Sequence, residues 1–185
     1  AELAICQFWQ RGFREIRLQL IDQALAELEL AANRHAEAIG LEGWRIEFAT
    51  ERETKKGTVS HGFSVALYQP GSEEPVSWET YSGGEVQRWQ LAVTFALSEV
   101  LLSRAGLSTD FEILDEPTQS LSSEGIEDLL DCLSDRAREL SRRIFFIDHH
   151  VLQAGGFDGV VTICKTRERG TYVEDDGGVL TAVVR

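Results

Sequence analysis

The sequence predicts an α/β fold with a mostly parallel sheet, flanking helices, an antiparallel edge and a long N-terminal helix. Two observations lead to this class. Apolar strands alternate with helices in the middle of the chain, in the order helix 85–102, strand 111–114, helix 123–140 and strand 143–147. Such alternation is typical of parallel strand pairing. In addition, apolar residues recur at helical spacing through residues 2–39, and Gly40 is a candidate C-cap.

The composition limits the class of protein. The chain has 185 residues, 43% of them apolar, so it can bury a core and one domain is the default. Its three cysteines have no short spacing, which argues against a disulfide framework or a zinc site and predicts a protein of the reducing cytoplasm. No apolar run is long enough to span a membrane. Methionine is absent, also at position 1, so we expect a piece of a longer protein.

The net charge of −13 bears on nucleic-acid binding. An acidic surface repels the phosphate backbone, so binding of DNA by this chain alone is disfavoured. If DNA is a partner, another segment or protein must supply most of the positive charge.

The remaining elements follow in chain order. The helix at 2–39 is either an ordinary amphipathic core helix or the root of a coiled coil, and we divide the chain into this helix (1–40) and a lobe (41–185). Helix 85–102 is apolar around most of its circumference, which predicts burial inside an α/β layer. The remaining β candidates are 44–51 and 62–69, joined by a polar turn, and 159–167, 171–174 and 179–184, which we expect to form a hairpin edge.

Two adjacent carboxylates, Asp115 and Glu116, follow the apolar strand 111–114. Ligands bind at the carboxyl ends of strands in open α/β sheets. Neighbouring side chains on a strand point in opposite directions, so we expect different tasks for the two. One can support a magnesium ion and the other can polarise an attacking water. The alternative is an ordinary turn at the end of a strand.

Two further segments carry polar groups at the ends of elements. Residues 82–85 (Ser-Gly-Gly-Glu) open a helix, where backbone N–H groups and the helix dipole favour an anion; the alternative is a plain N-cap. His149 follows strand 143–147 and can hydrogen-bond a phosphate oxygen. His149 and His150 could instead bind a metal, although adjacent histidines rarely share one ion.

The order of these segments resembles the ATP-binding-cassette ATPases of the SMC type. Residues 82–85 match the signature motif, with Tyr81 where Leu is usual, and 113–118 match the Walker B strand. Residues 119–121 match the start of the D-loop, followed by Ser122 where Asp is common, and His149 matches the switch histidine. The long first helix and the strand pair before the signature are similar to the C-terminal half of the head domain in the SbcC (Rad-fifty) branch.

The resemblance implies an ATPase that uses ATP and Mg²⁺. Asp115 would support the metal, Glu116 would be the catalytic base, and His149 would sense the γ-phosphate. The nucleotide contacts that the resemblance implies come from Ser82, Gly83, Gly84, Glu85, Gln87 and Ser120.

One required part is missing from the sequence. None of its lysines follows a glycine, so the chain has no Walker A phosphate loop. We therefore expect this chain alone to be inactive, and an N-terminal ATPase lobe carrying Walker A to complete the site.

Further partners are implied by the resemblance alone. They are a second head in a homodimer, a nuclease of the SbcD (Mre-eleven) type and double-stranded DNA. The implied process is double-strand-break repair or recombination, in the cytoplasm or at the nucleoid, with no membrane partner. The alternatives are a non-catalytic ATP-gated clamp, another SMC relative of the RecN or RecF type, and a transporter cassette.

Overall fold

The computed structural model describes residues 2–53, 59–149, 157–168 and 170–174. The chain divides into two compact units, Ala1–Gly106 and Leu107–Arg185. The first contains the helix α1 (Glu2–Ala38), the strands β1 (Arg45–Glu53) and β2 (Val59–Tyr68), the short 3-10 helix η1 (Trp78–Thr80) and the helix α2 (Gly83–Ala105). The second contains β3 (Phe111–Asp115), α3 (Ser123–Glu139), β4 (Arg143–Ile147), β5 (Thr162–Thr166) and β6 (Gly170–Glu174).

These elements confirm the predicted order of helices and strands. The α1 helix ends as expected, because Gly40 adopts a φ of 80° and the Leu41 N–H donates to the Ala36 carbonyl at 2.9 Å. The strand predicted at 179–184 lies outside the described residues. The division at residue 40 remains a prediction, and the coiled-coil role of α1 with it.

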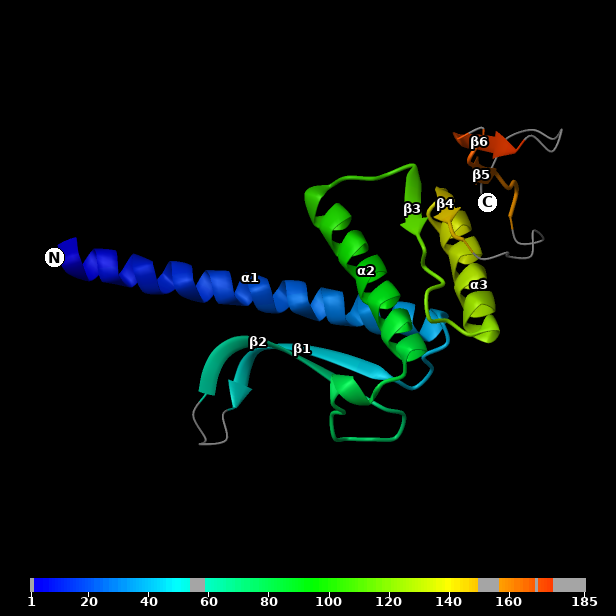
Figure 1. Ribbon diagram of the computed structural model, residues 1–185. Helices are drawn as coiled ribbons and strands as arrows, with labels where there is room; N and C mark the ends of the chain where they lie inside the picture. The colour runs from blue at the N-terminus through cyan, green and yellow to red at the C-terminus, as the bar shows by residue number, and fades with distance from the viewer. Residues whose placement is uncertain (1, 54–58, 150–156, 169, 175–185) are drawn as a thin grey trace. The chain divides into compact units, whose positions relative to one another are not determined.

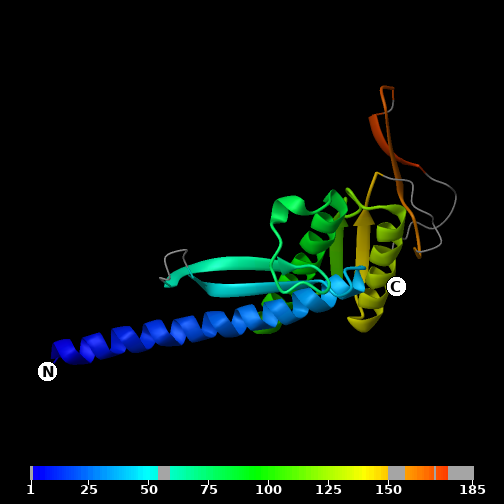
Figure 2. The same ribbon diagram turned by 90° about the horizontal axis from the view of Figure 1, so that it is seen from below.

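The antiparallel hairpin β1–β2 runs beside α1 in both views (Figures 1 and 2). Side chains of α1 pair with the backbone of β1. The Asn33 amide donates to the Ile46 carbonyl at 2.9 Å and accepts from the Ile46 N–H at 2.8 Å. The Glu29 carboxylate accepts from the Phe48 N–H at 2.9 Å. Polar residues of the helix thus satisfy backbone groups that an unpaired strand edge would leave free.

The core of the first unit forms where α2 crosses the C-terminal half of α1 (Figure 1). Small side chains on α1 let the two backbones approach. The Glu99 Oε2 atom of α2 lies 3.0 Å from the His35 Nε2 atom of α1. The buried apolar residues of this unit are Ala31, Ala32, Ala36, Ile39, Leu41, Ile46, Leu67, Trp89, Leu91, Ala92, Phe95 and Ala96. The predicted burial of α2 is found on the face that packs against α1, whereas Leu97 and Leu101 are 45% and 58% exposed.

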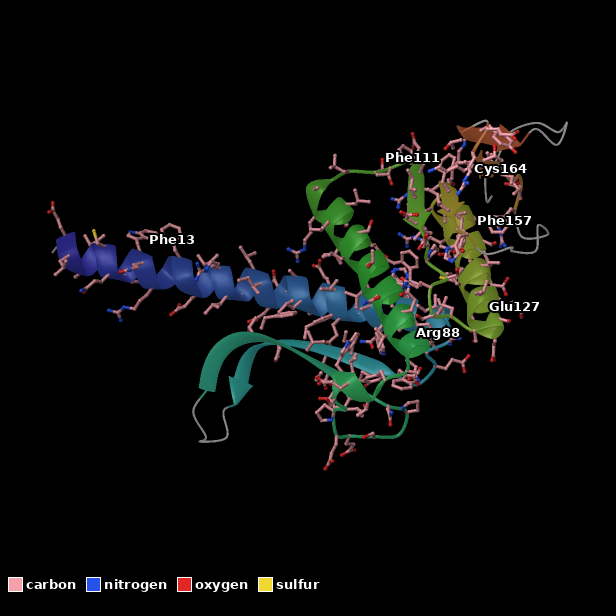
Figure 3. All side chains as sticks on the ribbon, viewed as in Figure 1. Phe13, Arg88, Phe111, Glu127, Phe157 and Cys164 are labelled. Carbon is pink, nitrogen blue, oxygen red and sulfur yellow. The ribbon has the colours of Figure 1, made fainter. Side chains whose placement is uncertain are left out.

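The N-terminal half of α1 extends beyond both α2 and the hairpin (Figures 1 and 2). Large apolar side chains on it are exposed, among them Phe13, which Figure 3 labels. None of the helices in the described residues combines the length and the apolar character that crossing a membrane requires.

In the second unit, β3 and β4 form a parallel pair and α3 is the crossover between them. The apolar face of α3, including Leu129 and Leu133, is buried, as is Ile144 of β4. The predicted α/β class is confirmed. The mostly parallel sheet is corrected to one parallel pair and two antiparallel pairs among the described strands, because β3 and β4 are the described pair that a helix joins.

One face of the β3–β4 pair is exposed and apolar. The side chains on it are Phe111, Ile113, Phe145 and Ile147, which are between 37% and 60% exposed. Strands of a parallel sheet are normally covered on both faces.

Candidate functional site

Asp115 and Glu116 lie at the carboxyl end of β3, as the sequence predicts. Asp115 is the last residue of the strand and stands opposite Ile147 of β4. The Glu116 N–H donates to the Ile147 carbonyl at 2.8 Å, so the two strands stay joined one residue beyond β3. Glu116 then adopts a φ of 48°, a left-handed conformation that is uncommon for a residue with a Cβ. Its side chain is therefore directed by a turn, not by the strand alternation that the sequence argument assumed.

Glu116 and His149 lie side by side. The Glu116 Oε1 atom is 3.4 Å from the His149 Nδ1 atom, and the two side chains are 53% and 63% exposed. They meet because parallel strands end at the same edge of a sheet, and each residue follows its strand closely. The structure thus brings together two predicted site residues and leaves both accessible to a ligand. His150 lies outside the described residues.

A hydrogen bond joins the two segments just beyond these residues. The hydroxyl of Thr118, whose residue is only 2% exposed, donates to the carboxylate of Asp148. Sequence reasoning did not single out either residue as a site residue, because no local pattern links positions 30 apart.

The loop from Thr118 to α3 is compact. The Leu121 N–H donates to the Thr118 carbonyl at 3.0 Å, and Ser120 is exposed with a φ of 66°. Ser122, which departs from the resembling motif, is the N-cap of α3, and its hydroxyl accepts from the Gly125 N–H at 3.2 Å. An Asp at this position would cap the helix equally well, so folding does not explain the departure.

Ser82 begins α2 through a capping box. Its hydroxyl accepts from the Glu85 N–H at 3.3 Å, and its own N–H donates to the Glu85 carboxylate at 2.8 Å. The Ser82 hydroxyl also donates to that carboxylate at 2.8 Å. Gly83 and Gly84 form the first turn of the helix. The Glu85 carboxylate therefore occupies the helix N-terminus, where a phosphate is favoured for the same electrostatic reason.

The residues around this turn are aromatic and partly buried. The Tyr81 ring lies 5.4 Å from that of Trp44 and 6.0 Å from that of Trp78. Burial, and then the charge of Glu85, raise the pKa of Tyr81. No described residue pairs with the Tyr81 hydroxyl. Gln87 is half-buried on α2.

Residues 82–85, which open α2, belong to the first unit, and the Glu116–His149 pair belongs to the second. An open cavity of about 670 Å³ in the first unit lies elsewhere, between α1, the start of β1 and the loop after β2, and none of the predicted site residues lines it.

The described residues contain no cluster of three or more His, Cys, Asp or Glu side chains that could hold a metal ion. Magnesium does not require one, since it is commonly bound by one or two carboxylates together with substrate phosphates and water. Asp115 fits this chemistry, because it is an exposed carboxylate residue at the carboxyl end of β3.

Glu112, on the opposite face of β3 from Asp115, forms a buried ion-pair network that the sequence analysis missed. Its partners are Arg136 of α3 and Arg142, which precedes β4. The signal in the sequence is a charged residue within an apolar strand, which is costly to bury unless it is paired.

Comparison with known proteins places the fold. No protein-family model and no curated protein matches the sequence. Among solved structures, a chain described under "Structural biochemistry of ATP-driven dimerization and DNA stimulated activation of SMC ATPases" has a TM-score of 0.64 at 15% identity, over 84% of this chain and 87% of that one.

Two other SMC heads have the same fold. An Smc head with a coiled coil and joint from Pyrococcus yayanosii has a TM-score of 0.63 at 16% identity, over 89% of this chain and 29% of that one. An Smc head bound to the C-winged-helix domain of ScpA has a TM-score of 0.58 at 16% identity, over 81% and 42%. This chain spans less than half the length of these two. It has the fold of part of an SMC ATPase head.

Proposed function

We propose that this chain is the C-terminal half of an SMC-type ATPase head of the SbcC (Rad-fifty) branch, which binds and hydrolyses ATP between two heads. The observation that carries the proposal is the Glu116–His149 pair, 3.4 Å apart at the edge of a parallel strand pair, directly after the exposed carboxylate of Asp115. The SMC-head fold supports it, and so does the order of the signature, Walker B and switch-histidine segments.

These residues suit phosphoryl transfer to water. The water oxygen bonds to the γ-phosphorus while the bond from that phosphorus to the leaving ADP oxygen breaks, and Glu116 accepts the proton of the water. His149 donates a hydrogen bond to a γ-phosphate oxygen. Mg²⁺ supported by Asp115 would offset the negative charge of the phosphates.

The signature segment serves the nucleotide of the opposite head in this proposal. The Ser82 hydroxyl and the N–H groups of Gly83 and Gly84 bind its γ-phosphate, with Glu85, Gln87 and Ser120 close to the nucleotide. Because the Ser82 hydroxyl donates to Glu85 in this structure, a phosphate oxygen must replace the carboxylate as its acceptor. Head–head engagement is then coupled to ATP binding.

An N-terminal lobe with the Walker A loop completes the head. The exposed apolar face of β3–β4 (Phe111, Ile113, Phe145, Ile147) supports this, since a two-stranded sheet is marginal without further packing. The exposed apolar residues on the projecting half of α1 support its role as the root of a coiled coil.

We further propose that ATP-driven engagement controls DNA binding and a nuclease of the SbcD type. The net charge of −13 means that other segments supply most of the DNA contacts. Binding assays of the complete head with an SbcD-type nuclease and with a ScpA-type winged-helix domain distinguish this branch from the Smc branch. Selective binding of the winged-helix domain would refute the SbcC assignment and leave the ATPase proposal intact.

The Glu116→Gln variant of the complete two-lobe protein tests the ATPase proposal. Gln cannot accept the proton of the water, so hydrolysis should stop while ATP-dependent dimers persist. Glu127→Gln, on the exposed surface of α3 (Figure 3), is the matched control and should hydrolyse ATP normally. Unchanged hydrolysis in Glu116→Gln would overturn the assignment of the base.

A further inference from the structure

The Thr118–Asp148 hydrogen bond is placed to control the geometry of the site. Thr118 lies two residues after Glu116, and Asp148 lies one residue before His149. The bond therefore joins the two segments that carry the proposed base and the proposed phosphate sensor. Its donor residue is 2% exposed, so water does not readily compete for the hydroxyl.

A second hydrogen bond joins the same segments, two residues before Thr118 and one residue before Asp148. The Glu116 N–H donates to the Ile147 carbonyl at 2.8 Å. The turn at Glu116, where φ is 48°, is therefore held by two hydrogen bonds. One joins the backbones of Glu116 and Ile147, and the other joins the side chains of Thr118 and Asp148. A left-handed conformation in a residue with a Cβ persists only where the surroundings impose it.

We propose, resting on the ATPase function above, that Thr118 and Asp148 are positioning residues that hold the Glu116 carboxylate beside His149. A charged acceptor makes this hydrogen bond stronger than a bond between neutral groups. Neither residue touches the nucleotide in this proposal. They act on catalysis by fixing the distance between the groups that do.

Four variants separate the hydrogen bond from the bulk of the side chains. Thr118→Val keeps the shape and removes the donor, whereas Thr118→Ser keeps the hydroxyl. Asp148→Ala removes the acceptor, and Asp148→Asn keeps an oxygen that can accept. The control is Thr94→Val, which removes an exposed hydroxyl that donates only to the Gln90 carbonyl within α2, at 2.7 Å.

Two measurements are made, one structural and one kinetic. In the complete two-lobe protein, nuclear Overhauser contacts between the His149 ring and the Glu116 side chain should be present in the wild type, Thr118→Ser and Asp148→Asn, and absent in Thr118→Val and Asp148→Ala. In the complete two-lobe protein, Thr118→Val and Asp148→Ala should lower kcat by about tenfold or more and leave the KM for ATP within about twofold. Positioning residues fix the geometry of the reacting groups and not the binding of ATP. Thr118→Ser should restore kcat.

Contacts that persist in Thr118→Val and Asp148→Ala would overturn the inference. If Thr118→Val does not fold, the Asp148→Ala and Asp148→Asn pair gives the same decision. If the contacts are lost as expected while the wild-type two-lobe protein does not hydrolyse ATP, the proposed function is wrong and the positioning role of the pair stands. Lost contacts with an unchanged kcat would refute the catalytic part of the inference.

Discussion

Arg136 donates two hydrogen bonds, from Nε and Nη2, to the two carboxylate oxygens of Glu112, each at 2.8 Å. Arg142 adds a third to Oε1 at 2.6 Å. The side chain of Arg136 is 6% exposed, that of Glu112 is 15% exposed and that of Arg142 is 12% exposed. This network joins β3 to α3 and to the residue before β4, on the face of the strand pair opposite to the exposed apolar one. It therefore fixes the frame on which Asp115 and Glu116 are carried.

Glu112→Gln should destabilise the protein by about 3 kcal/mol at pH 7, because removing one charge leaves buried partners uncompensated. Burial raises the pKa of Glu112, but the hydrogen bonds and charges of Arg136 and Arg142 outweigh it, and the pKa lies below the usual 4.5. The contribution of the carboxylate is thus complete above about pH 4.5 and is lost as the pH falls through the lowered pKa. Urea unfolding of wild type and variant at several pH values measures it.

The difference between wild type and Glu112→Gln should shrink below pH 4.5, and an equal difference at pH 7 and pH 3 would contradict the prediction. Asp135→Asn is the control. Its partner Arg138 is 3.0 Å away, but both side chains are about two-thirds exposed, so removing the pair should have little effect at any pH.

The sequence predicts those parts of the fold that depend on local patterns. The apolar runs at 111–114 and 143–147, the helical spacing in α1 and α3, and the turn at Gly40 each determine an element by themselves. The edge shared by Asp115, Glu116 and His149 also follows from sequence, because parallel strands place their carboxyl ends together.

The remaining features depend on contacts between distant positions. The pairing of Glu112 with Arg136 requires knowing which face of α3 meets which face of β3, and the Thr118–Asp148 bond spans 30 residues. Because Glu116 lies in a left-handed turn, its side chain does not follow the alternation of side-chain directions along β3. The local sequence Asp-Glu-Pro does not predict this φ. The alternation of strands and helices correctly predicts the parallel pair β3–β4, but it does not state that the other described strands pair as antiparallel hairpins.

Cys132 should resist thiol reagents in the folded protein. It is buried on α3, and burial raises the pKa of its thiol to about 11. Only about a thousandth of it is thiolate at pH 8. Cys6 is exposed and should react at once, so mass spectrometry after brief maleimide treatment should find Cys6 labelled and Cys132 unlabelled until denaturant is added. Rapid native labelling of Cys132 would mean that α3 is not packed as described.

Ser120→Gly should stabilise the loop after β3, or leave its stability unchanged. Ser120 has a φ of 66°, where a Cβ costs about 1 kcal/mol. Glycine avoids this strain but loses a similar amount of free energy through its greater loss of conformational entropy on folding. Ser141→Gly is the matched control, since Ser141 has a φ of 51° and lies outside the site. Thermal unfolding should give similar shifts for both. Marked destabilisation by Ser120→Gly alone would show that its side chain makes a contact that the backbone argument omits.

Ser82→Ala separates the helix-capping role of Ser82 from its proposed role toward ATP. Loss of a serine N-cap costs about 1 kcal/mol, and Ser122→Ala, which removes the N-cap of α3, should cost about the same in urea unfolding. Ser82→Ala should in addition prevent ATP-driven dimerisation of the complete head well below its melting temperature, because the γ-phosphate loses a hydroxyl donor. Analytical ultracentrifugation with and without ATP measures this loss. Dimers of wild-type affinity in a folded Ser82→Ala protein would show that Ser82 serves only to cap α2, and the signature segment would then have no part in binding nucleotide through this hydroxyl.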